Sequence, residues 1–355
     1  MKSIEITRRN FLLGSLTLGS VLMFSKRSSS AVKKNEFIPV GMQVSQQFRE
    51  DVFRLKLKRK SDSIRLLQLT DLHFNPLRRE KKVDEDTKNL VRKLIELTEP
   101  DLVAITGDVW NENPFGKGLS FLESSVEFFG TLGVPWLYTW GNHDMLSDYS
   151  KGHDILARGN NSLYRGGLNR GNYEVVIENE EGKDLWRLIC INTSNYGFLE
   201  EQLSWLRGWI EKNKSNTTPT FMIFHIPIFQ YHTIWEEKIA SGVKFEKVCY
   251  EKEEGSAFET INKVPGLKAC ICGHDHVNDY SGLYKGIDLI YGRATGRGGY
   301  GSDLVPKGGK LYTLFPSTGE YDWASITDDN ERWHPPKNMR IEKKEELPWL
   351  HKLSG

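Results

Sequence analysis

The sequence of 355 residues predicts an α/β sandwich built on a mixed β-sheet core. Short, nearly continuous apolar runs recur along the chain, which is typical of strands that are buried on both faces. Amphipathic helical segments separate several of these runs, as they do where helices cover a sheet. The composition, 38% hydrophobic with 48 basic and 47 acidic residues, fits a globular chain with a large core.

The first predicted strand lies where Phe53, Leu55 and Leu57 alternate with basic residues, as in a half-exposed strand. A helix is predicted over residues 83–100, and a second helix over residues 200–213. The fully apolar runs predict six further strands, which cover residues 64–70, 101–106, 134–140, 187–193, 220–225 and 267–272.

The remaining segments are predicted from their length and polarity. The connections 149–173 and 229–264 are long, and we expect them to be irregular insertions that face a substrate. The polar residues after Thr327 are expected to pack along the surface. The predicted organisation is therefore an export signal, an N-terminal strand segment, a central domain and a tail, at residues 1–31, 32–62, 63–326 and 327–355.

The N-terminus predicts export. Arg8 and Arg9 precede an apolar run over residues 11–24, and small residues follow up to Ala31. This run is shorter than the roughly 20 apolar residues that span a bilayer, and its flanks are those of a signal peptide. Residues 7–12 are similar to the twin-arginine export motif. An ordinary secretory signal or an uncleaved anchor remains open, and each alternative predicts a periplasmic or secreted protein.

Charge and cysteine content exclude some classes. The net charge of +1 provides no basic field, so general nucleic-acid binding is not expected, and apart from the export signal we expect no membrane association. Cys190, Cys270 and Cys272 lie within apolar runs, where cysteine usually acts as a small buried hydrophobe. A structural disulfide is therefore not expected.

Polar side chains of the types that bind metals follow five of the predicted strands. In α/β sheets, ligands bind at the carboxyl ends of strands, so we expect these residues to converge. Oxygen and nitrogen donors without thiolate suit Mn, Fe or Zn in a site that is not a structural zinc site. The residues are Asp71 and His73, Asp108, Asn142 and His143, His225, and His274 and His276.

In this order the residues resemble the motifs of the calcineurin-like metallophosphoesterases, a superfamily that includes the purple acid phosphatases: D-x-H, G-D, G-N-H-D, a lone H and G-H-x-H. The match runs from about Ile64 to His276. The resemblance implies a four-layer sandwich of two mixed sheets flanked by helices, with a two-metal site. By position it assigns Asp71, His73 and His276 to the first metal, Asn142, His225 and His274 to the second, and Asp108 to both.

One departure indicates the branch of the superfamily. The purple enzymes carry an iron-binding tyrosine three places after the aspartate of G-D and lack the first histidine. Here Asn111 stands at that place and His73 is present. The chain therefore resembles the non-purple D-x-H subgroup. The segments "CGHDHVNDY" and "ATGRGGYGS" resemble signature segments of the same subgroup.

The resemblance implies hydrolysis of phosphate mono- or diesters by a hydroxide shared between two metal ions, which also clamp the phosphoryl oxygens. His143 is expected to donate a proton to the leaving oxygen or to contact the phosphoryl group. Asp144 is expected either to orient His143 or to be a surface acid. Arg297, in a glycine-rich turn, is a candidate substrate contact. The alternative function is an exported metal-binding protein without turnover.

Overall fold

The computed structural model describes residues 42–44, 51–57, 62–194, 196–252 and 255–350. The chain divides into two units, 1–36 and 37–355, and the fold described here is that of the second unit. The predicted export signal lies outside the described residues. Among the helices of the described residues, none has the length and apolarity that crossing a membrane requires.

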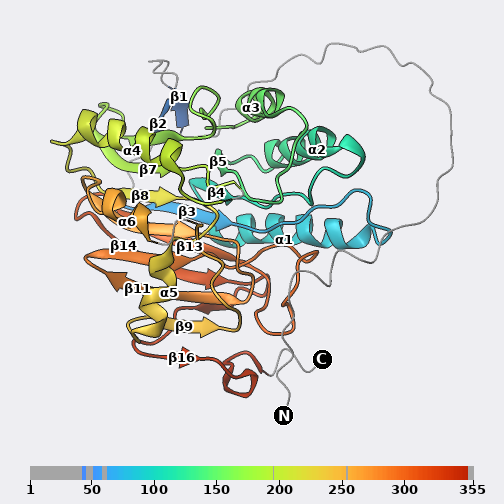
Figure 1. Cartoon of the computed structure of the whole chain (residues 1–355). Helices are drawn as coiled ribbons and strands as arrows, with labels where there is room; N and C mark the ends of the chain where they lie inside the picture. Colours follow the sequence, from blue (N-terminus) through green and yellow to red (C-terminus); the bar gives the residue numbers. More distant parts are fainter. Residues whose placement is uncertain (1–41, 45–50, 58–61, 195, 253–254, 351–355) are drawn as a thin grey trace, which may run out of the picture. The chain divides into compact units, whose positions relative to one another are not determined.

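Six α-helices lie in the described part of the chain (Figure 1). In α1, Asp84 and Glu85 occupy the first turn, where negative charge is favourable for the helix dipole. In α3, the Asp148 side chain caps the helix by accepting a hydrogen bond from the backbone N–H of Lys151 (3.1 Å). The helices are α1 (Lys82–Thr98), α2 (Gly118–Gly130), α3 (Tyr149–Arg158), α4 (Glu200–Asn213), α5 (Phe229–Glu236) and α6 (Ser256–Ile261).

A six-stranded mixed sheet contains the first three site motifs. Strands β3, β4 and β5 are parallel, and β13 joins the sheet antiparallel to β3. Leu90 and Leu94 of α1 are buried in the same core as these strands. The strand order is β15 (Arg332–Trp333), β14 (Glu320–Ile326), β13 (Gly309–Phe315), β3 (Ile64–Leu69), β4 (Leu102–Thr106) and β5 (Trp136–Thr139).

A ten-stranded mixed sheet contains the other two motifs. Strands β7, β8, β10 and β12 run parallel to their neighbours in this set. The strand order is β1 (Met42–Val44), β2 (Val52–Leu57), β6 (Tyr173–Glu178), β7 (Asp184–Cys190), β8 (Thr220–Ile223), β10 (Leu267–Cys272), β12 (Ile287–Tyr291), β11 (Asn278–Tyr284), β9 (Ser241–Lys244) and β16 (Arg340–Ile341).

The two sheets pack face to face, and strand alternation shows how. In β8, Phe221 and Ile223 belong to the core between the sheets, and Phe221 contacts Tyr312 of the other sheet with ring centroids 5.6 Å apart. Met222 belongs instead to a second core that is shared with residues of α4, α5 and α6. Successive residues of one strand therefore bury opposite faces, and helices flank the paired sheets as predicted.

The main elements confirm the sequence predictions. All six apolar runs form strands, both predicted helices are present, and β2 buries Phe53, Leu55 and Leu57 on one face. Cys190, Cys270 and Cys272 are buried thiols in strands.

Two predictions of irregular structure are wrong. The connection 149–173 contains α3, and the connection 229–264 contains α5, β9 and α6. Their mixed polar sequences conceal helices whose buried faces are set by tertiary packing. The segment after Thr327 adds β15 to one sheet and β16 to the other, so these residues extend the sheets.

Candidate metal centre

The motif residues from both sheets meet at the carboxyl ends of their strands. Two hydrogen bonds join the motifs across the sheets. The His225 ring Nδ1 lies 2.7 Å from the carbonyl oxygen of Thr106, and the backbone N–H of His274 donates to Asp71 Oδ2 (3.1 Å). The predicted convergence of five strand ends is therefore present in the fold.

One group of candidate ligands comprises Asp71, His73 and His276, all buried. Their ligand atoms lie within 4.8 Å of one another. The Nε2 atoms of His73 and His276 are 3.0 Å apart, and Asp71 Oδ1 is 3.4 Å from His276 Nε2. Three lone-pair donors therefore face a common point, which is the arrangement that a cation requires.

A second buried group comprises Asp108, His225 and His274. Asp108 Oδ2 is 3.1 Å from His225 Nε2, which in turn is 3.2 Å from His274 Nδ1. The same Oδ2 atom is 3.9 Å from His73 Nε2 in the first group. Asp108 thus lies between the two groups, at the position expected of a shared ligand.

Two buried oxygen atoms at this centre accept no hydrogen bond from the described residues: Asp71 Oδ1 and Asn142 Oδ1. A buried polar atom without a partner costs about 1–3 kcal/mol. Asn142 lies next to His143, whose backbone N–H donates to Asp108 Oδ1 (2.8 Å). The donor chemistry and these two oxygens therefore fit bound cations at both groups.

The backbone at the centre is strained. Asp71, His73, Asp108 and His274 have positive φ angles of 55°, 49°, 51° and 80°, a region that costs non-glycine residues about 1–3 kcal/mol each. A Cβ atom on Gly141 would lie 2.2 Å from the Asp108 backbone nitrogen, so only glycine allows the two loops to pack this closely. Such strain is typical of functional sites.

The electrostatics also indicate a site for positive charge. Burial, together with the charge of nearby His276, lowers the pKa of His73 to about 3, so its imidazole is a neutral donor. Burial would raise the pKa of Asp108, but the facing His225 holds it well below its usual value. Burial would lower the pKa of His225, but Asp108 raises it to about 10. A proton on His225 therefore balances a buried carboxylate that a cation would otherwise balance.

Neighbouring groups orient two of the imidazoles. His73 Nδ1 lies 3.0 Å from Asn111 Oδ1, and His225 Nδ1 contacts the Thr106 carbonyl. In each case the hydrogen bond assigns a proton to Nδ1 and directs Nε2 at the centre. In His73 this Nε2 atom carries a lone pair, whereas in His225 a bound cation would replace the Nε2 proton that faces Asp108. The residue that replaces the iron-binding tyrosine of the purple enzymes thus supports His73, a role that the sequence does not reveal.

His143 lies at the edge of the centre. Its ring packs edge-on against His73 with centroids 5.2 Å apart, and its side chain is 31% exposed. Its Nδ1 is 3.6 Å from Glu112 Oε1, and the backbone N–H of Glu112 donates to the His143 carbonyl (2.8 Å). The carboxylate beside His143 is therefore Glu112, which sequence reasoning missed because it follows the G-D motif at no recognised position.

The surface-acid interpretation of Asp144 is wrong, because the residue is 1% exposed. Its carboxylate accepts hydrogen bonds from the backbone of Asp108 (2.9 Å) and Gly141 (2.8 Å) and from the Tyr138 hydroxyl (2.7 Å). Burial, followed by the charge of Asp108, raises the pKa of Asp144 to about 6. These contacts tie the second and third motif loops together, and both carboxylate oxygens are engaged there rather than with the His143 ring.

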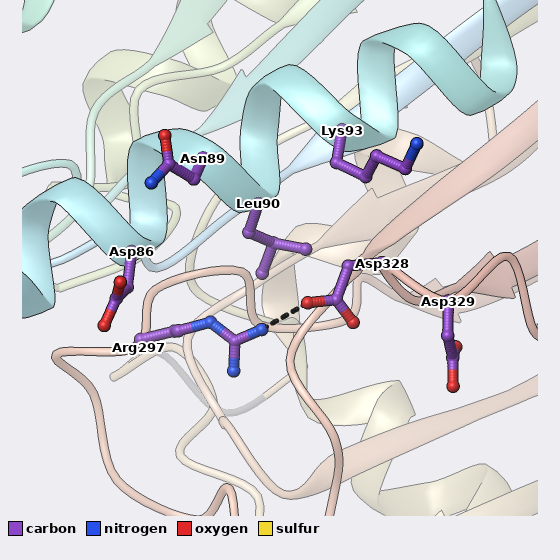
Figure 2. A pocket seen from close by; sticks show the side chains of 7 residues that line it. All are labelled: Asp86, Asn89, Leu90, Lys93, Arg297, Asp328 and Asp329. Carbon is purple, nitrogen blue, oxygen red and sulfur yellow. Dashed lines mark hydrogen bonds and ion pairs between the residues drawn. The ribbon is translucent and has the colours of Figure 1, made fainter.

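Arg297 contacts helix α1 and Asp328. Its guanidinium pairs with Asp328 (2.5 Å), and its backbone N–H donates to Thr87 of α1 (3.0 Å). Figure 2 shows it in a pocket against α1 with Asp86, Asn89, Leu90, Lys93, Asp328 and Asp329. The candidate metal ligands are not among the described residues that line this pocket. The role of Arg297 as a substrate contact therefore stays a prediction.

The glycine-rich turn nevertheless reaches the centre through other residues. The ring of Tyr300 stacks on His276, and a Cβ atom on Gly299 would lie 2.7 Å from the His276 ring. Cys249 and Asp275 also lie near His274, with ligand atoms of all three within 4.8 Å. Asp275 accepts hydrogen bonds from the Tyr291 hydroxyl (2.7 Å) and from the Cys249 backbone N–H (3.2 Å).

Comparison with known families agrees with this geometry. The profile of the calcineurin-like phosphoesterase family matches residues 64–278, which include all seven candidate ligands. The chain belongs to the calcineurin-like phosphoesterase family. Proteins of this family depend on metal ions, and the two buried groups lie within the matched region.

Family relatives include Probable inactive purple acid phosphatase 28 of Arabidopsis thaliana, 28% identical over 321 residues that cover 76% of this chain and 79% of the relative. Phosphatase DCR2 of Saccharomyces cerevisiae is 24% identical over 61% of this chain and 44% of its own length. A solved structure of a dimetal phosphatase from Danio rerio superposes with a TM-score of 0.52 at 12% identity, over 76% of this chain and 98% of that protein. That likeness shows the shared fold.

Proposed function

We propose that this calcineurin-like phosphoesterase binds two divalent or trivalent metal ions and hydrolyses phosphate mono- or diesters. The observation that carries the proposal is the position of Asp108 Oδ2, 3.1 Å from His225 in one ligand group and 3.9 Å from His73 in the other. A carboxylate between the two groups would hold both ions, and two-metal sites of this kind support phosphoryl transfer. Mn, Fe or Zn suits the oxygen and nitrogen donors.

When bound, the two ions would supply an activated water and neutralise the charge of the phosphoryl group. The residues of the chain then have distinct tasks. Asp71, His73 and His276 would hold one ion, Asn142, His225 and His274 the other, and Asp108 both. Asp144 would hold neither ion. Its hydrogen bonds to the backbone of Asp108 and Gly141 fix the loops that present Asp108 and Asn142.

His143 is the proposed proton donor to the leaving oxygen. Its backbone is fixed by Asp108, its ring borders His73, and its partial exposure leaves it open to a substrate. Glu112, rather than Asp144, is positioned to orient the ring through the 3.6 Å contact of its Oε1 with Nδ1.

The alternative is a metal-binding protein without turnover, and one observation favours it. Three of the similar plant proteins carry the words "probable inactive" in their names. Against it stands His143, because a protein that only binds metal needs no half-exposed imidazole beside the ligands. Phosphatase DCR2, also similar, is named for activity.

The test is a panel of phosphate mono- and diesters assayed with metal-stripped protein after separate reconstitution with Mn, Fe, Zn or Ca. We expect hydrolysis to disappear with the chelator and to return with Mn or Fe. Protein that binds metal but hydrolyses no ester of the panel would support the non-catalytic alternative.

His143→Ala tests the proton donor. A general acid contributes about 10²–10⁴-fold, so kcat on an alkyl phosphate should fall strongly, whereas a nitrophenyl ester with a good leaving group should lose much less. Equal losses on both esters with full metal content would assign His143 to phosphoryl binding instead, and loss of a metal ion would make it a ligand.

We further propose that the protein is exported by the twin-arginine route to the periplasm or beyond. The support is the sequence of residues 7–31. Replacement of Arg8 and Arg9 by lysine should retain active enzyme in the cytoplasm, as measured by fractionation. Equal export of the double variant would refute this route.

A further inference from the structure

The imidazole of His276 is held differently from the other two imidazoles described above. His73 and His225 each have a hydrogen-bond acceptor at Nδ1, which fixes the ring and its tautomer. The Nδ1 atom of His276 is buried and has no hydrogen-bond partner among the described residues. Metal-binding histidines nearly always have such an outer partner, so another contact has to orient this ring.

The contact that the structure provides is an aromatic stack. The rings of Tyr300 and His276 are nearly parallel, with centroids 4.1 Å apart and an interplanar angle of 10°. A ring held face to face in this way keeps its plane, because any rotation about the Cβ–Cγ bond other than a half-turn flip would lose the stack. The plane kept is the one in which His276 Nε2 lies 3.0 Å from His73 Nε2 and 3.4 Å from Asp71 Oδ1.

Tyr300 is itself anchored at both ends. Its hydroxyl donates to Glu246 Oε2 (2.6 Å), and the other oxygen of Glu246 accepts the backbone N–H of Val277 (2.9 Å), the neighbour of His276. The Tyr300 carbonyl accepts a hydrogen bond from the buried Lys307 ammonium (2.6 Å). The ring is therefore fixed relative to the backbone that carries His276.

The glycines beside Tyr300 allow this close approach. A Cβ atom on Gly299 would lie 2.7 Å from the His276 ring, and one on Gly301 would lie 2.1 Å from Val277 Cγ1. Gly301 also has φ +83°, which disfavours any other residue. The glycine-rich turn thus packs closely against residues 276–277, and this packing places the Tyr300 ring on the His276 ring.

We propose that Tyr300 is a positioning residue that holds His276 in its ligating orientation through ring stacking, an inference that rests on the proposed metal centre. Tyr300 touches neither the metal position nor a substrate in this role. Its effect falls on the group formed by Asp71, His73 and His276, whereas the group formed by Asp108, His225 and His274 keeps its own contacts.

The experiment titrates metal-stripped full-length protein with Co²⁺ and follows its visible absorption spectrum, with ion counts by mass spectrometry. In Tyr300→Ala we expect binding at one of the two sites to weaken by about 10–100-fold, the range for loss of an outer partner, together with a changed spectrum for that site. Tyr300→Phe keeps the stack and should bind within about threefold of wild type.

Two further variants keep the test decisive. Tyr300→Leu retains apolar bulk without a planar ring, so it should weaken the same site even if Tyr300→Ala folds poorly. Tyr284→Ala is the matched control. Strand β11 begins at Asn278, close to His276, and Tyr284 lies at its other end, about 20 Å along the strand. This variant should bind Co²⁺ as wild type does.

Three outcomes would overturn the proposal. These are wild-type affinity and spectrum in both Tyr300→Ala and Tyr300→Leu, equal weakening at both sites, and a weakening matched by Tyr284→Ala. Wild-type protein that binds no Co²⁺ would overturn the metal centre as well, so failure of the centre and failure of the Tyr300 role are distinguished.

Discussion

Two buried polar clusters in this fold differ in how their charged side chains find partners. At the ion cluster between the sheets, formed by Asp279, Arg293, Lys310 and Ser325, each hydrogen bond to Asp279 joins a donor to a carboxylate oxygen. Asp279 Oδ1 accepts from Lys310 (2.6 Å), and Asp279 Oδ2 accepts from Arg293 (2.8 Å) and Ser325 (2.8 Å). At the metal centre, by contrast, lone-pair donors face one another.

The difference separates structural polarity from functional polarity. Asp279 and Lys310 are fully buried, as is Asp71 at the metal centre, so burial alone does not distinguish the clusters. What distinguishes them is the backbone strain and the unbonded oxygens of Asp71 and Asn142. The charges of the ion cluster are balanced by side chains of the protein, whereas those of the proposed metal centre would be balanced by bound cations.

The largest expected effect is on activity at the metal centre. Asp108→Ala removes the one carboxylate within reach of both groups, so both ions should bind weakly and hydrolysis of a nitrophenyl ester should fall by at least about 10³-fold. The metal-free variant should still unfold cooperatively. Comparable activity to wild type would show that Asp108 is not shared.

The ion cluster should give the reverse result. Asp279→Asn keeps the side-chain volume but leaves the buried Lys310 and Arg293 without their carboxylate. Breaking a buried ion pair costs about 3–5 kcal/mol, which urea unfolding of metal-free protein would measure. The kcat of the folded fraction should match wild type. A large loss of kcat without a loss of stability would erase the distinction between the clusters.

The pH dependence of stability sharpens the comparison further. Burial would raise the pKa of Asp279, but Lys310 and Arg293 hold it at about 2. Because the folded pKa is depressed below the unfolded value of 3.8, this contribution is present above pH 4 and is lost as the pH falls from about 4 to 2. It amounts to about 2 kcal/mol.

The check is acid unfolding of metal-free wild type and Asp279→Asn in parallel. The stability difference between them should shrink as the pH falls through this window. A difference that stays constant from pH 6 to pH 2 would show that the charge of Asp279 contributes nothing to the fold.

The smallest effect is expected at the exposed edge of the metal centre. Glu112 is 51% exposed in its side chain and lies 3.6 Å from His143 Nδ1, and such exposed pairs contribute about 0.2–1 kcal/mol. Glu112→Gln should therefore lower kcat no more than about fivefold and leave metal content unchanged. A loss as large as that of His143→Ala would make Glu112 an equal partner in proton transfer.

The sequence predicted the strands and the convergence of the candidate ligands because both follow from local patterns. Apolar runs define the strands, and motif residues directly follow them, as Asp71 follows β3 and His225 follows β8. The contacts of Asp144 and Arg297 could not be predicted in this way, because their partners are set by how loops pack. Asp144 bonds to the loop of Asp108, 36 residues away, and Arg297 pairs with Asp328.

The ion cluster and the Tyr300 stack illustrate the same limit. Asp279 and Lys310 are 31 residues apart on different sheets, and no spacing rule relates them. Tyr300 and His276 meet only because glycines let their backbones approach. Helix α3 could not be predicted for a similar reason. It buries only Gly152 and Leu156, so packing against its neighbours rather than an apolar pattern defines its buried face.

The most direct test of the account is a calorimetric titration of metal-stripped wild-type protein with Mn²⁺. We predict two ions bound per chain, with cooperative loss of both in Asp108→Ala and wild-type binding by the folded fraction of Asp279→Asn. Absence of binding by wild-type protein, or two ions retained in Asp108→Ala, would contradict the claim that the buried centre is completed by a pair of cations that share Asp108.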